Sequence, residues 1–536
     1  MNKENSKRKI LRIGLIVLVI IFVVLTGIQL FLSFYLDSYV EKRLKTAVSE
    51  QTLGQYQLEM SALDLRVWGK EFQIDSLRLS PTDTASTAPR IQMDQLSISG
   101  IQFLPYLFGG NIYTGQVRFS KPVVTLTKNS PDSLNFLQSS DRSSSSSNKN
   151  PPDIEVDRFE INEGVFALLN QEQSDSLGEL HDFNLEILNI RVDSTTLAKP
   201  PFFNFSAIQT RSGKIRYEMS DFYAMESNGI DFSTSEGAFS VDSLKLLPQY
   251  PKYEFAQHKG HQLDRITLTV ERLLLENTDI EKLNFGEIDA KKFTIQNADL
   301  EVFHAKMMPP GPKSNKTYPH IAFKNLPFPI TIDTLAIHQA DIRYTEHLAE
   351  VSRPGTVSFL NTNATFTDVT NDSTVISREH TIVLDVTSEV MGEATLDAHF
   401  EFPMHLDGSH MTRGTLQSMQ AEDLNPILEP VGLVRASRGT LHSLQFLMDL
   451  GDDEATGWVQ LIYSDLRIQV LNSDDVDDGG RNRLKTFLAN ILKIKGSNNE
   501  VPYRRGEVSF ERDEQKSIFS YWWKSLSTGL KESVGI

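Results

Sequence analysis

The stretch FQIDSLRL (residues 72–79) decides the fold, because its pattern recurs along the chain. Apolar residues alternate with other residues on both sides of an aspartate, as a β-strand with one buried face requires. Spacings between copies range from 19 to 85 residues, which excludes a short-period solenoid. Full copies begin at Ile91, Ile154, Phe239 and Ile330, and a copy without its first apolar residue surrounds Asp264.

The alternation shifts by one residue at each of these aspartates. Such a shift would move the apolar side chains to the other face of the sheet. A β-bulge or a sharp bend beside the aspartate would restore a single apolar face and curve the sheet. The alternative is that each aspartate marks a turn between two short strands. In both cases the aspartates have a structural role.

Further strands are expected shortly after several copies. Alternating apolar runs at residues 165–169, 300–303 and 342–344 each follow a glycine or aspartate, which indicates hairpins. Residues 111–128 form another such run, with Pro122 at an edge or bulge, and residues 458–463 and 466–470 read as one more hairpin. Long helical periodicity is nearly absent from residue 60 to 420. The sequence therefore predicts a mainly β protein built on a long, twisted antiparallel sheet.

Short helices are expected near the C-terminal end. Residues 424–431 follow the potential cap Asp423, and residues 484–494 are amphipathic. A helical apolar stripe then contains Ile518, Phe519, Trp522, Trp523, Leu526 and Leu530. This stripe either caps the sheet or contacts a membrane through Trp522 and Trp523, with Lys524 and Lys531 nearby.

An uncharged segment, residues 13–36, follows a basic N-terminal tail of residues 1–12. At about 1.5 Å per residue it exceeds the roughly 30 Å hydrocarbon core of a bilayer. It is too long for the apolar region of a signal peptide, and it ends in Phe34-Tyr35-Leu36 instead of small residues. We therefore expect a single transmembrane anchor, with residues 1–12 in the cytoplasm and the body outside. Its apolar residues include Ile13, Leu15, Ile16, Val19, Phe22, Leu25, Leu30 and Phe34.

Composition narrows the functional classes. The chain has 536 residues and a formal charge of −17, and the part beyond residue 36 holds 48 basic and 69 acidic residues. A body this acidic is a poor binder of nucleic acid. The absence of cysteine excludes disulfides and thiolate catalysis. His258 and His261 lack a carboxylate pair, His399, His405 and His410 lack metal-ligand spacing, and no nucleotide or hydrolase motif occurs. We expect no enzyme and no cofactor.

The anchor, the early paired strands and a C-terminal run together resemble a known family. The run reads Gly414-x-Leu416, then Asp423-Leu424-x-Pro426-Ile427-Leu428, then Gly439-x-Leu441. It is similar to the AsmA-like family of Gram-negative envelope proteins, relatives of TamB. The resemblance implies a β-sheet curled into a groove with an apolar interior, associated with phospholipid movement between inner and outer membranes. It implies no catalytic residues.

On this basis four regions are expected: the tail 1–12, the anchor 13–36, an elongated groove body 37–410 with a low-complexity loop 139–152, and an AsmA-like C-terminal region 411–536. The expected location is the inner membrane, with the body in the periplasm. The expected function is phospholipid binding or conduction that supports outer-membrane lipid homeostasis. The alternative is a scaffold or chaperone for outer-membrane protein assembly, without lipid. The residues expected to line the groove are Ile91, Met93, Leu96, Ile98, Ile154, Val156, Phe159, Ile161, Ile330, Ile332, Leu335 and Ile337.

Overall fold

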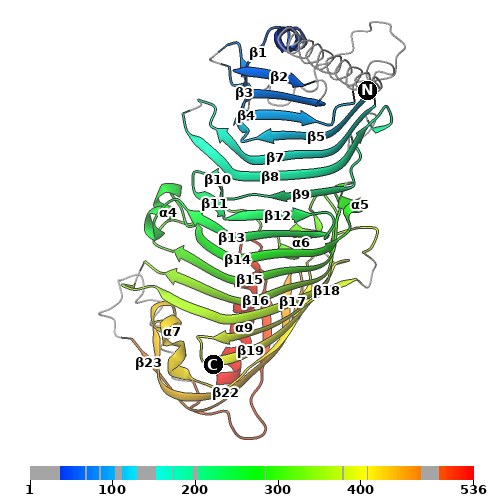
Figure 1. Cartoon of the computed structure of the whole chain (residues 1–536). Helices are drawn as coiled ribbons and strands as arrows, with labels where there is room; N and C mark the ends of the chain where they lie inside the picture. Colours follow the sequence, from blue (N-terminus) through cyan, green and yellow to red (C-terminus); the bar gives the residue numbers. More distant parts are fainter. Residues whose placement is uncertain are drawn as a thin grey trace, which may run out of the picture. The chain divides into compact units, whose positions relative to one another are not determined.

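A computed structural model describes residues 37–536 apart from 67–68, 84–85, 103–110, 129–152, 173, 197–202, 284, 350, 377–379, 407 and 472–493. The chain divides into two compact units, Met1–Ile215 (unit 1) and Arg216–Ile536 (unit 2). The boundary expected between residues 410 and 411 therefore falls inside unit 2. The described residues form 24 strands and few helices (Figure 1), so the prediction of a mainly β protein is confirmed.

Unit 1 is a mixed sheet preceded by a helix over residues 37–51. β3 pairs with β1, β2 and β4, and β4 pairs with both β5 and β6. β5 and β6 both run parallel to β7, which is followed in the sheet by β8 and β9. The strands are β1 (Tyr56–Glu59), β2 (Ala62–Arg66), β3 (Glu71–Pro81), β4 (Arg90–Ser99), β5 (Ile112–Ser120), β6 (Val123–Thr127), β7 (Ile154–Leu169), β8 (Ser176–Val192) and β9 (Ala207–Arg211).

Unit 2 is also a mixed sheet. β13 pairs with β11, β12 and β14, and β15 runs antiparallel to β14 but parallel to β16. The strands are β10 (Ile215–Ser220), β11 (Tyr223–Ser227), β12 (Gly229–Ser233), β13 (Ala238–Pro248), β14 (Asp264–Thr278), β15 (Ile288–Ala305), β16 (Ile330–His347), β17 (Gly355–Thr370), β18 (Thr381–Val390), β19 (Ala394–Pro403), β20 (His410–Leu416), β21 (Met419–Gln420), β22 (Val434–Leu450), β23 (Glu454–Val470) and β24 (Gly506–Glu511).

The helices of unit 2 are short except for the last. They are α4 (Lys252–Lys259), α5 (Ile280–Leu283), α6 (Pro319–Lys324), the 3-10 turn η2 (Ala421–Leu424), α7 (Asn425–Gly432) and α9 (Ile518–Val534). α9 lies against β22–β24, inside the curve of the surrounding strands (Figure 1). Most of the described pairings are antiparallel, as expected, but each unit also contains parallel strand pairs, so the sheet is mixed.

Polar residues in the left-handed backbone conformation interrupt the long strands. Ser76 and Ser243, directly after the motif aspartates Asp75 and Asp242, have φ of 50° and 51°. The backbone therefore bends beside the aspartate in these two copies, but the register of β3 with β4 and of β13 with β14 continues without a shift, so the interruption is not a β-bulge. The same conformation, with φ between 49° and 58°, occurs within the described strands at Glu163, Asp182, Asn189, Asn277, Asn297, Gln339, Asn361, Asp368 and Asp465.

Each of these residues resets the alternation of side chains. An apolar residue lies two positions before it, and the residue directly after it returns to the same face. In β17, Ala364 and Phe366 precede Asp368, Val369 follows it, and all three belong to one core. The predicted hairpins at residues 165–169, 300–303, 342–344 and 466–470 are consequently wrong, because the chain continues through the left-handed residue as one strand in β7, β15, β16 and β23.

Candidate functional site: the apolar face of unit 1

The sheet of unit 1 carries rows of large apolar side chains on one face. Cross-strand register aligns Phe72 on β3 with Ile98, Val117, Phe159, Ile187 and Ile208 on β4, β5, β7, β8 and β9. A neighbouring row contains Ile74, Leu96, Phe119, Ile161 and Leu185. The rings of Phe119 and Phe159 meet edge to face at 5.3 Å between centroids. At about 4.8 Å per strand, six adjacent strands make a face about 24 Å wide.

The opposite face of the same strands is polar. Between the two apolar rows, the register aligns Gln73, Ser97, Arg118, Glu160, Glu186 and Gln209. Arg118 Nε donates to Glu160 Oε2 at 2.7 Å, and Arg158 pairs with Glu186 at 3.1 Å. The guanidinium of Arg118 contributes to lowering the pKa of Glu160, against the opposing effect of burial. One face of this sheet is therefore hydrated and ion-paired, and the other is apolar.

The apolar face has little covering it among the residues that the structure describes. Most side chains of the two rows are only half-buried, with Ile74 and Ile187 as the buried exceptions. The described part of unit 1 contains no packed cluster of buried apolar side chains, since all such clusters lie in unit 2. The described helix 37–51 is tied to β2, where Asp37 accepts a hydrogen bond from the Leu65 amide at 2.9 Å.

In unit 2, helices cover one face of the sheet. Buried residues of β16–β19 form one core (core A) with Phe323 of α6 and Trp522 of α9 packed against it. A second core (core B) joins β19–β24 to α9. Ser525 and Ser533 of α9 are fully buried, and Gly529 lies so close to Val459 that a Cβ would approach its side chain to 2.7 Å. This row of small residues lets the helix sit directly on the sheet.

Some residues predicted to line a groove lie on the sparsely covered sheet of unit 1, and the others lie under the helices of unit 2. Of those on β4 and β7, Leu96, Ile98, Phe159 and Ile161 lie in the two apolar rows of unit 1. The other four, Ile91, Met93, Ile154 and Val156, lie outside these rows. Those of β16 (Ile330, Ile332, Leu335, Ile337) belong to core A, so they do not line an uncovered face. Sequence analysis missed the residues contributed by β5, β8 and β9, which become recognisable only through the strand register.

The paired tryptophans of α9 lie on different sides of the helix. Trp522 packs at 4.9 Å from the ring of Phe400, and its Nε1–H donates to His410 Nε2 at 2.7 Å. Trp523 is 63% exposed. Since Trp522 is held against the sheet, it cannot contact a membrane in this arrangement, which favours the capping role for the inward side of α9.

The predicted anchor residues Ile13, Leu15, Ile16, Val19, Phe22, Leu25, Leu30 and Phe34 lie outside the described residues, as does the loop 139–152. No helix within the described ranges is sufficiently long and apolar to cross a membrane.

The motif aspartates have structural partners. Asp75 accepts hydrogen bonds from Gln73 and Gln95 at 2.9 and 3.1 Å, and Asp333 pairs with Lys291 at 2.9 Å. His258 stacks on Tyr250 at 3.9 Å. Within the described ranges, no group of three or more histidine and acidic side chains could hold a metal ion.

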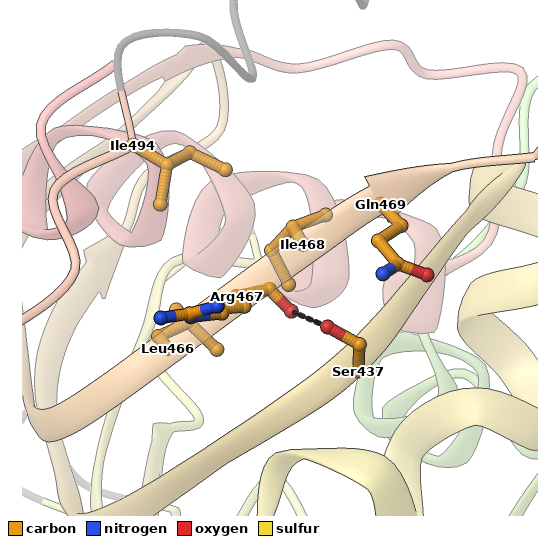
Figure 2. A pocket seen from close by; sticks show the side chains of 6 residues that line it. All are labelled: Ser437, Leu466, Arg467, Ile468, Gln469 and Ile494. Carbon is orange, nitrogen blue, oxygen red and sulfur yellow. Dashed lines mark hydrogen bonds between the residues drawn. The ribbon is translucent and has the colours of Figure 1, made fainter.

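A small depression of about 310 Å³ lies on β22 and β23, beside Ile494 (Figure 2). It is lined mainly by residues 466–469, and Ser437 Oγ donates to the Arg467 carbonyl across it at 3.3 Å. The cluster contains one charged side chain and no acid–base pair, so it provides no chemistry for catalysis. The apolar face of unit 1 is the more extensive candidate site.

Comparison of the sequence with known protein families and with curated proteins finds no match. The resemblance to the AsmA-like family therefore depends on the residues quoted above.

Proposed function

We propose that the apolar face of unit 1 binds the acyl chains of phospholipids. In this proposal the chain is an AsmA-like protein of the inner membrane with its body in the periplasm, where it supports outer-membrane lipid homeostasis. The observation that carries the proposal is the alignment of apolar rows across β3–β9, with no packed core above them in the described residues. Large exposed apolar surfaces mark sites where a partner or ligand binds.

The dimensions of the face suit an acyl chain. Its width of about 24 Å exceeds the roughly 15 Å of hydrocarbon that one bilayer leaflet contributes. Burying a methylene from water releases about 0.8 kcal/mol. Moving a methylene from the bilayer core to this face releases almost no free energy, because the bilayer core is already apolar. Such a face would keep lipid out of water while allowing it to return to a membrane, as transfer requires.

Adjacent residues of β9 offer a matched test. Ile208 lies in an apolar row opposite Ile187, whereas Gln209 lies on the polar face opposite Glu186. The full chain, extracted in mild detergent, should carry phospholipid detectable by mass spectrometry. Ile208→Lys should lose most of this lipid, and Gln209→Lys should retain it.

A lipid-free wild-type chain would refute the proposal and favour the assembly scaffold. Equal lipid content in the two lysine variants would show that lipid binds elsewhere on the chain.

A further inference from the structure

Two buried histidines lie beneath the N-terminal half of α9. His410 is 4% exposed, and the ring of His320 lies 5.5 Å from the His410 ring. Phe402 packs on both, with centroid distances of 5.0 and 5.5 Å. Neither ring nitrogen of His320 makes a hydrogen bond of good geometry within the described residues. The Gly408 carbonyl acts on both imidazoles and opposes the effect of burial on their pKa values.

The contact between His410 and α9 requires a neutral imidazole. His410 Nδ1 lies 2.8 Å from the Gly408 carbonyl, so this nitrogen must carry the proton. His410 Nε2 is then the acceptor for the Trp522 indole N–H at 2.7 Å. Protonation of Nε2 would place two donors against each other. The hydrogen bond that holds Trp522 is therefore available only while His410 is uncharged.

The surroundings oppose a positive charge at this position. Arg512 lies 4.1 Å from the ring of Tyr318, which is itself 5.6 Å from the His410 ring. The nearby carboxylate of Asp452 is engaged by Arg512 at 3.5 Å. Other titratable or charged groups that act on this cluster are Lys324, Glu454, Glu514, Tyr318 and Tyr521. Burial lowers the pKa of His410 to about 4, and burial together with the neighbouring His410 lowers the pKa of His320 to about 4.

We infer that the N-terminal half of α9 is an acid-released lid on core A, and that the hydrogen bond from Trp522 to neutral His410 is the pH-sensitive part of its closure. The helix is joined to β24 by residues 512–517 and takes part in no strand pairing. Its N-terminal half also buries Ile518 and Tyr521 in core B, and the Tyr521 hydroxyl donates to the Gly451 carbonyl at 3.0 Å. Opening must release these contacts but breaks no strand pairing. Its C-terminal half has a separate attachment, in which Ser533 Oγ accepts from the Leu461 amide at 2.9 Å. Lifting the N-terminal half would uncover Phe400 and Phe402.

The expected size of the effect follows from the histidine. If His410 regains an ordinary pKa of about 6.5 when Trp522 lifts, lowering the pH from 7 to 4 raises the opening equilibrium by up to about 100-fold. If the proposed lipid function also holds, the uncovered surface is additional acyl-binding area. The lid itself is measured without lipid, so its failure would leave the lipid proposal intact.

A single thiol reports the opening. The chain has no cysteine, and Ser525 is fully buried on the side of α9 that faces the sheet, so Ser525→Cys introduces one protected thiol. Its reaction with 4,4′-dithiodipyridine proceeds in acid, so the reaction rate can be measured at pH 4 and at pH 7. The ratio of the rate at pH 4 to the rate at pH 7 should be at least tenfold larger than the same ratio for the exposed control Lys531→Cys. Adding His410→Gln, which keeps an acceptor but does not titrate, should remove most of this acceleration.

Limited digestion of the otherwise unmodified chain by an acid-active protease gives a second measurement. At pH 4 it should cut within α9, and His410→Gln should suppress the cut. A thiol that stays protected at pH 4, equal acceleration with His410→Gln, or simultaneous loss of the strand signal in circular dichroism would each overturn the inference.

Discussion

Ser243 tests whether left-handed residues determine the path of the long strands. It has φ of 51° in the middle of β13, between Val241 and Leu244, which face the same side of the sheet. A left-handed conformation costs an L-residue about 1–2 kcal/mol. Glycine escapes this cost but loses about 0.5–1 kcal/mol through its greater freedom in the unfolded chain. We therefore expect Ser243→Gly to leave stability within about 1 kcal/mol of wild type.

Valine at the same position should be clearly harmful. A β-branched residue with positive φ is a steric outlier, so Ser243→Val should lower the free energy of unfolding by about 2 kcal/mol or more. Lys245 is the matched control, because it is exposed and lies in the same strand outside the left-handed positions. There the order should reverse, with glycine about 1 kcal/mol less stable than valine.

Urea unfolding followed by tryptophan fluorescence measures these differences in unit 2. Trp458, Trp522 and Trp523 all lie in that unit, so the signal reports mainly on its unfolding. At each position we take the free energy of unfolding of the glycine variant minus that of the valine variant. This difference should be about 3 kcal/mol larger at residue 243 than at residue 245. If Ser243→Gly and Lys245→Gly destabilise unit 2 equally, the idea that left-handed residues reset the side-chain alternation is refuted.

Three further outcomes are expected. Burial lowers the pKa of His320 and of His410 to about 4, so the unfolded chain takes up protons first as the pH falls. Between pH 6.5 and 4, unit 2 should therefore lose up to about 3 kcal/mol of stability for each of the two histidines. Urea unfolding at both pH values measures this loss. Trp522→Phe should cost about 1–2 kcal/mol by leaving His410 without its donor, while the exposed Trp523→Phe should change thermal stability by less than about 0.5 kcal/mol. Glu429→Ala should destabilise by about 1–3 kcal/mol in a denaturant titration, because this buried carboxylate bonds both Arg353 and Arg435.

The strand content and the bends beside the motif aspartates could be predicted from sequence because both have local causes. The slip in alternation at Asp75 and Asp242 is visible in the apolar pattern, and it locates Ser76 and Ser243 within one residue. The same slip misled the interpretation elsewhere. Gly164, Asp299 and Asp341 resembled turn residues, yet each lies inside a continuous strand. A local pattern shows that the alternation changes phase, but it does not distinguish a bend within a strand from a turn.

The pairing of strands depends on contacts between distant residues. The parallel pairing of β5 with β7 matches residues 42 positions apart, and that of β15 with β16 does the same. The connection from β5 to β7 includes residues 129–152, which lie outside the described residues, and the connection from β15 to β16 includes α6. Neither connection carries a helical pattern that would signal a parallel crossover. For the same reason, sequence did not show which copies of the motif lie under α6 and α9 and which remain uncovered.

The left-handed residues connect the fold to the proposed function. β7 and β8 span 16 and 17 residues, longer than one uninterrupted alternation in either strand. Without Glu163, Asp182 and Asn189, the apolar residues beyond each slip would point to the polar face of the sheet. The apolar surface would then break into patches on both sides, none of them as wide as an acyl chain is long. A continuous apolar face therefore requires residues that tolerate the left-handed conformation at these positions, which a β-branched apolar residue does not.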